Sequence, residues 1–274
     1  MKAAQTLSAS ATSLTRRWPF TAGQTDWLVT LLFTAFWLWF AWQHGFDNSP
    51  DSWYRGLLAN SIIEGHSYLI NLRQGWLYEH PVWHPDAAHP PFLPAIYALY
   101  FYFFGPQISI ANVVVSLSAG LLVLPLMRLS RLLTGGAIAG LLVYLAVAFN
   151  DKADFIFEVF SGLSIPVALA LLAAAAYFML QLAITGAFRH LLGGVLALVG
   201  FYYVRPGEQV IFAWLMLWAL ILGHRLLPRQ RWVSQMQMWG MGSLLALPWA
   251  VRNFVLLGSP FFTHTTPALW ADRG

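Results

Sequence analysis

Long apolar runs alternate with short polar segments along most of the chain, and this alternation predicts a bundle of membrane-spanning helices. Seven runs have about spanning length, although the third and the fifth are short. They lie near residues 27–45, 108–127, 134–149, 165–184, 190–204, 209–226 and 237–256. No internal repeat of fixed period accompanies them. We therefore expect an all-α polytopic membrane protein with about seven transmembrane helices.

One further apolar segment, residues 92–105, is either a short span or a helix on the membrane surface, and the basic residues decide between the two. If it does not cross, nine of the fifteen basic residues lie on the inner side and ten of the eleven acids lie outside. If it crosses, only seven basic residues remain inside. Because Lys and Arg favour the cytoplasmic side, we predict seven spans, with the N-terminus in the cytoplasm and the chain in the plasma (inner) membrane.

This topology divides the chain into three parts. Residues 1–26 form a cytoplasmic tail, residues 27–256 a transmembrane module, and residues 257–274 a tail on the outer side. The first outer loop, about residues 46–107, is the longest and is expected to contain membrane-surface helices. Because the inner loops are short and basic while polar residues collect outside, we expect a functional site on the outer face.

Composition narrows the function classes. With 58% hydrophobic and 9% charged residues, the chain is not an ordinary soluble domain. This apolar composition predicts membrane lipids as partners. The net charge of +4 comes from dispersed basic residues, so we expect no nucleic acid as a partner. The absence of cysteine excludes disulfides, thiol catalysis and thiolate metal sites.

The first candidate for chemistry is the stretch "DNSPDSWYRGLLANSIIEG", at the start of the long outer loop. Ser49 before Pro50 is a typical helix start and Gly65 a typical helix end, so we predict an amphipathic helix of about 15 residues on the membrane surface. Asp51 falls in its first turn, where the helix dipole favours an acid. Two interpretations stay open: an acid that stabilises the helix start, or a general base with Asp47 as a nearby second acid.

The second candidate is "EHPVWHPDAAHPPF", residues 79–92, which has neither a helical nor a strand period. His80, His84 and Asp86 are ligand types that Zn, Mn or Fe accept, so a divalent metal is one interpretation and a hydrogen-bonded turn is the other. No cofactor follows from these residues with certainty. His89 precedes two prolines, and this stiff turn is expected to direct it back to the membrane surface.

Charged residues at the predicted outer ends of spans form the third candidate. Arg205 and Arg252 each lie where a cation near hydrocarbon snorkels, pairs or binds an anion. Because the planar fork of arginine matches phosphate oxygens, the alternative to simple snorkelling is a site for a lipid-linked phosphate. Glu158 is either part of a solvated helix end or a member of that site.

Taken in order, these segments resemble the C-type membrane glycosyltransferases, in particular the branch of the dolichyl-phosphate-mannose–protein mannosyltransferases and the bacterial aminoarabinose transferases of lipid A. Four places within about residues 27–262 carry the resemblance: the Asp51 helix closed by Gly65, the His89-Pro90-Pro91 turn before an apolar segment closed by Gly105, "RPGE", and "PWAVRNFVLLGSPFF". Many relatives have a second acid where Ser52 stands and continue beyond the position of Gly274. We therefore expect either a truncated or minimal member, or a chain whose missing part handles the acceptor and is supplied by a partner.

The resemblance implies an inverting glycosyltransferase whose donor is a sugar linked to polyprenyl phosphate. Asp51 matches the catalytic acid, which would deprotonate the acceptor, and the donor phosphate would be bound by His89, Arg205 and Arg252. The residues expected to line the site or contact the acceptor are Tyr54, Glu158, Glu208 and Asn253. The acceptor would be a lipid, a glycan or a protein on the outer face of the membrane.

Two other classes of function stay open from the sequence. A transporter or lipid flippase would place acids near the bilayer midplane, whereas the predicted spans contain almost no charge. A catalytically silent scaffold or assembly subunit would keep the fold without the chemistry. An isosteric change of Asp51 that abolishes function without loss of folding would exclude the scaffold.

Overall fold

The computed structural model describes residues 21–44, 50–66, 69–71, 83–85, 90–107, 109–150, 155–205, 214, 216–217, 221 and 224–257. Nearly all of them are helical, which confirms the predicted helical class. The helices are α2 (Ala22–His44), α3 (Pro50–Ile63), α4 (Phe92–Phe104), α5 (Ile110–Leu121), α6 (Val123–Thr134), α7 (Ile138–Ala148), α8 (Phe155–Phe160), α9 (Ile165–Thr185), α10 (Phe188–Val204) and α12 (Arg229–Leu257).

A short antiparallel pair of strands accompanies the helices. β1 (Leu69–Asn71) pairs with β2 (Trp83–Pro85), and Ile70 lies opposite His84. The sequence shows no strand period at these positions because three residues are too few to display one. The pairing depends on a partner segment that lies elsewhere in the chain, so local patterns do not reveal it.

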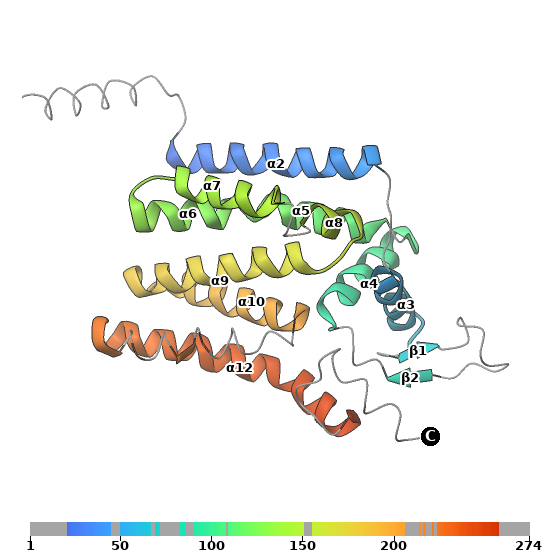
Figure 1. Ribbon diagram of the computed structural model, residues 1–274. Coiled ribbons are helices and arrows are strands. Elements are labelled where there is room, and N and C mark those ends of the chain that lie inside the picture. Colours follow the sequence, from blue (N-terminus) through green and yellow to red (C-terminus); the bar gives the residue numbers. More distant parts are fainter. Residues whose placement is uncertain are drawn as a thin grey trace, which may run out of the picture.

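The long helices lie side by side with roughly aligned axes, while α3 and α4 lie together at one end of the bundle (Figure 1). α2 ends at this end, α5 and α6 run away from it, and α7 returns to it. α9 runs away again, and α10 and α12 both run toward it. We call this end the α3 end and the opposite end, where α6 meets α7, the Arg131 end. The predicted span 209–226 lies mostly outside the described residues, so the order of crossings stays a prediction, in which the α3 end is the outer one.

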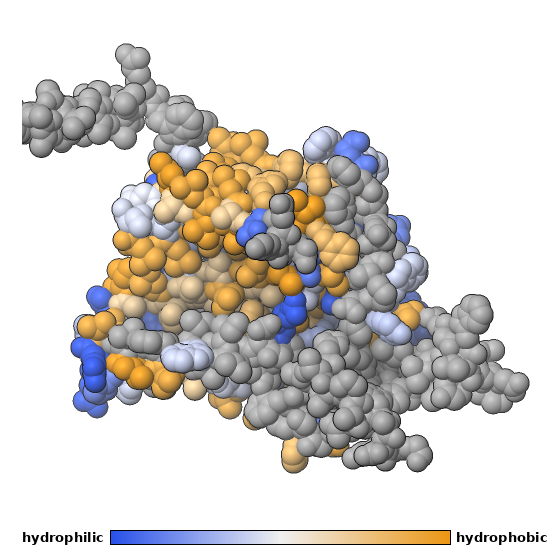
Figure 2. Space-filling model, in the orientation of Figure 1, coloured by the Kyte–Doolittle hydropathy of each residue, from blue (hydrophilic) through white to orange (hydrophobic). Residues whose placement is uncertain are grey.

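Three described segments are long and apolar enough to cross a membrane: Ala22–Gln43, Ile110–Thr134 and Ile165–Thr185. Hydrophobic side chains cover much of the bundle between its two ends in Figure 2, as expected of a membrane protein. α4 has 13 residues, whereas crossing the hydrocarbon core takes about 20. α7, which lies within a predicted span, is shorter still with 11 residues. Helix length therefore does not separate α4 from the predicted spans, and the count of seven spans stays a prediction.

The first helix begins earlier than predicted. Residues 22–26, which were assigned to the cytoplasmic tail, belong to α2. Thr21 and Gln24 explain this start, because each side chain accepts a hydrogen bond from the backbone N–H of the other, at 3.3 and 2.8 Å. This reciprocal arrangement is the capping box, which stabilises a helix N-terminus independently of hydropathy.

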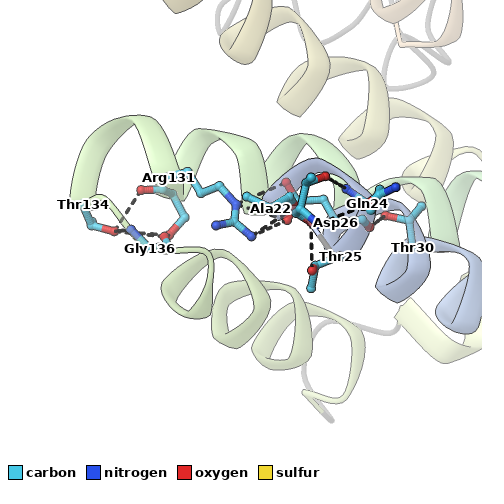
Figure 3. A network of polar contacts seen from close by, with 10 residues as sticks. Ala22, Gln24, Thr25, Asp26, Thr30, Arg131, Thr134 and Gly136 are labelled. Atoms are coloured by element: carbon cyan, nitrogen blue, oxygen red, sulfur yellow. Dashed lines mark hydrogen bonds and ion pairs between the residues drawn. The ribbon is translucent and has the colours of Figure 1, made fainter. Parts of the chain in front are cut away.

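An ion pair between a buried acid and a partly exposed arginine joins α2 to α6 at the Arg131 end (Figure 3). The Asp26 side chain is almost fully buried, and the Arg131 Nη2 atom lies 2.8 Å from Asp26 Oδ1. Arg131 Nε also donates to both carboxylate oxygens at 3.2 Å, and Nη2 donates to the Ala22 carbonyl at 3.4 Å. The two helices are therefore tied together by a forked, charge-assisted contact between residues far apart in the sequence.

α6 and α7 approach each other closely enough that a side chain on Gly140 has no room. A Cβ atom placed there would contact the Leu126 carbonyl oxygen and lie 2.6 Å from the Leu126 carbonyl carbon and 2.8 Å from the Met127 nitrogen. These are backbone atoms, so α6 would have to move. The glycine thus permits the short separation of the two helices.

We expect Gly140→Ala to lower the free energy of unfolding by about 1–3 kcal/mol, because overpacking a tight contact forces a backbone shift. Reversible unfolding in detergent micelles measures this. Gly240→Ala is the matched control, since a Cβ at Gly240 on α12 meets no atom within 4 Å. Equal stability of the two variants would contradict the close approach of α6 and α7.

Candidate functional site

α3 begins at Pro50 and ends before Gly65, as the sequence predicts. Gly65 has a φ of 80°, and the His66 N–H donates to the Ser61 carbonyl at 2.9 Å, so the helix closes through a left-handed glycine. Asp51 is the second residue of α3, in the first turn. Its side chain lies outside the described residues, as do Asp47, His89 and Glu208.

The face of α3 that packs against the bundle contains polar side chains. Ser52 is fully buried and Arg55 is 5% exposed, beside the fully buried Leu58 and Ala59. Tyr54, predicted to line the site, is 44% exposed and is thus on the open side of the helix. Sequence reasoning assigned no role to Arg55, although it lies three and seven positions before Leu58 and Ile62, on the same helical stripe.

The buried side chains of α3 meet the turn between α8 and α9. Ser52 Oγ lies 2.7 Å from the Ser161 carbonyl oxygen and 3.0 Å from the Gly162 carbonyl oxygen. Arg55 Nη1 donates to the same Gly162 carbonyl at 3.3 Å. These carbonyls belong to the turn after α8 and to neither helix, and buried carbonyls need donors, which α3 supplies.

Glu158 accepts hydrogen bonds from the same α8–α9 connection through both its side chain and its backbone. Its side chain is 8% exposed, and Oε2 accepts a hydrogen bond from the Ile165 N–H in the first turn of α9 at 3.4 Å. The Leu163 N–H donates to the Glu158 carbonyl at 2.9 Å. A carboxylate at a helix N-terminus is favoured by the helix dipole. In the structure Glu158, predicted to line the site, therefore stabilises the start of α9.

Tyr97 of α4 completes this buried polar region. Its side chain is fully buried and lies beside the guanidinium group of Arg55. Burial raises the pKa of Tyr97 to about 12, and the positive charge of Arg55 opposes part of that rise. The hydroxyl is therefore neutral at physiological pH. The charge of Arg55 on α3 thus acts on the Tyr97 hydroxyl of α4, which is buried without a hydrogen-bond partner among the described residues.

The two predicted phosphate-binding arginines lie near one aromatic cluster. Arg205 is half-buried and directly follows the last residue of α10. Arg252 on α12 lies 4.6 Å over the Trp249 ring, and Trp249 packs with Tyr202 near the end of α10. Because α10 and α12 both run toward the α3 end, the structure brings the two arginines to the same end of the bundle as Asp51 (Figure 1).

Asn253, the remaining predicted site residue on α12, is 1% exposed. Its Oδ1 atom accepts a hydrogen bond from Arg252 Nη1 at 3.2 Å. The stacking on Trp249 and this hydrogen bond both orient the Arg252 side chain, so Asn253 acts on its neighbour in sequence.

The predicted metal ligands are mostly outside the described residues. His80 and Asp86 lie there, and of His84 only the backbone, in β2, is described. Among the residues that the structure does describe, no group of three or more His, Asp or Glu side chains lies close enough to hold a metal ion.

The apolar helices with a polar region at one end define a helical membrane protein. In comparisons with known proteins, the chain matches no protein-family model and no curated protein.

Proposed function

We propose that this protein is a glycosyltransferase that uses a polyprenyl-phosphate-linked sugar on the outer face of the plasma (inner) membrane. One observation carries the proposal: the start of α3, with Asp51, lies at the same end of the bundle as Arg205 and Arg252. A base and two phosphate-binding cations at one membrane boundary are what transfer from a lipid phosphate requires. The resemblance of the sequence to C-type membrane glycosyltransferases supports the same reading.

The proposed reaction uses each group in one role. Asp51 accepts the proton of an acceptor hydroxyl or amine, whose oxygen or nitrogen forms a bond to the anomeric carbon. The bond between that carbon and the phosphate oxygen breaks, and its electron pair leaves with the polyprenyl phosphate. Arg205 and Arg252 stabilise the charge that grows on the departing phosphate. Attack from the face opposite the phosphate inverts the anomeric configuration.

The proposal is tested by donor binding and turnover in nanodiscs. A polyprenyl phosphate bearing a radiolabelled hexose serves as donor, and a solubilised membrane extract supplies lipid, glycan and protein acceptors. Binding together with release of polyprenyl phosphate supports the proposal. Failure of the wild type to bind the donor overturns it, and binding without release under all conditions points to a silent scaffold.

Arg252→Gln is expected to weaken donor binding about 10- to 100-fold, because it removes charge-assisted hydrogen bonds to the phosphate, each worth roughly 1.5–3 kcal/mol. Titration of the labelled donor measures the change. Arg229→Gln provides the control on the same helix, since Arg229 begins α12 at the opposite end of the bundle. Equal affinities of the two variants would remove Arg252 from the donor site.

A further inference from the structure

We propose that the α8–α9 turn is the seat on which α3 docks, and that Ser52 and Arg55 are the positioning residues that hold Asp51 in place. This inference rests on the proposed function, because it assigns to Ser52 and Arg55 the placement of the proposed base. The seat itself consists of the Ser161 and Gly162 carbonyls, which accept hydrogen bonds from Ser52 and Arg55.

Ser52 fixes the position of α3 at the residue next to Asp51. Its hydroxyl lies within hydrogen-bond distance of two carbonyls, at 2.7 and 3.0 Å, and it is fully buried. A carboxylate at this position would place acceptor oxygens against acceptor oxygens and be repelled. The seat therefore requires a donor such as serine, and not an acid, at this position.

Arg55 fixes the rotation of α3 about its axis. It lies three positions after Ser52, nearly one turn further, and bonds the same Gly162 carbonyl. Two contacts a turn apart on one face leave a helix little freedom to rotate, and each residue of misregister would turn Asp51 by about 100°. Asp51 lies four residues, about one turn, before Arg55. The contacts of Arg55 therefore also fix the position of residue 51 around the helix axis.

The seat requires a glycine at its centre. Gly162 has a φ of 65°, in the left-handed region, and a Cβ atom there would lie 2.9 Å from Ser52 Oγ and 2.9 Å from the Ala111 Cβ atom. Any side chain would push α3 away from the turn. The close approach of α3 thus depends on Gly162 in the α8–α9 turn as well as on the residues of α3.

The test measures the position of α3 and the chemistry separately. Because the chain has no cysteine, spin labels at Trp53→Cys on α3 and Leu142→Cys on α7, two exposed positions, report their distance by electron paramagnetic resonance. We expect Ser52→Ala and Arg55→Gln to shift or broaden the distance distribution. Ser61→Ala, which removes another buried hydroxyl from α3 about two and a half turns after Ser52, should leave it unchanged.

In Ser52→Ala and Arg55→Gln we expect the kcat for release of polyprenyl phosphate to fall about 10- to 100-fold. The KM should change little, because only the base is displaced. Ser52→Thr, which keeps the hydroxyl, should restore much of the rate. A distance distribution that Ser52→Ala and Arg55→Gln leave unchanged overturns the seat, and a shifted distribution with an unchanged kcat overturns its role in positioning Asp51. If the wild type itself does not turn over the donor, the proposed function fails, and the distances alone decide whether the seat exists.

Discussion

Asp51→Asn is expected to lower the release of polyprenyl phosphate about 10²- to 10⁴-fold, the range that a general base contributes. Asparagine has the shape of aspartate but cannot accept the acceptor's proton at neutral pH. The affinity for the donor should change less than about twofold, since phosphate binding is assigned to other residues. A loss of binding alone would raise KM and leave kcat unchanged. Stopped assays with the labelled donor, together with donor titration, separate the two quantities.

Folding and charge are controlled in the same experiment. Asparagine is a good residue at a helix start, so the loss of the carboxylate there costs only about 0.3–1 kcal/mol through the helix dipole. Glu64→Gln removes an acid just beyond the other end of α3, where it accepts a hydrogen bond from Asn60 at 2.6 Å, and should leave turnover unchanged. A full rate in Asp51→Asn, with loss of rate in Asp47→Asn, would move the role of base to Asp47.

Arg131→Met is expected to destabilise the protein by about 3–5 kcal/mol, because it leaves the carboxylate of Asp26 buried without its counter-charge. The loss should be visible as a lower free energy of unfolding in detergent. It should also weaken the association of α2 with α6, since the forked contact joins these helices near the start of α2 (Figure 3).

Two further variants decide whether this loss comes from the ion pair. The double variant Asp26→Leu/Arg131→Met should recover most of the stability, because well-packed apolar residues commonly replace a buried pair at little cost. Arg128→Met is the matched single control on α6. The guanidinium carbon of Arg128 lies 5.6 Å from the ring centroid of Trp27 and 5.7 Å from that of Tyr177. Such cation–π contacts are worth about 0.5–2 kcal/mol. A double variant as unstable as Arg131→Met would contradict the account.

Local signals in the sequence predict α3 and α4 well. Pro50 at the start of α3, Gly65 after its end and Gly105 after α4 are all found in the predicted roles. Each signal acts within one or two turns of the residue that carries it, through a missing N–H or a left-handed backbone, so no distant contact is needed to recognise it. The capping box at Thr21 is equally local. Hydropathy alone placed the helix start too late, because the apolar run begins only near residue 27.

Hydropathy by itself determined that this is a helical membrane protein, because burial in lipid depends on composition over a whole helix. Charge added the prediction that its polar chemistry lies at one boundary. Only the tertiary structure decided which polar residues meet. The contacts of Ser52 and Arg55 with the Gly162 carbonyl, and of Asp26 with Arg131, each join positions more than 100 residues apart. Such pairs leave no periodic trace in the chain, since they arise where segments far apart in the sequence are packed together.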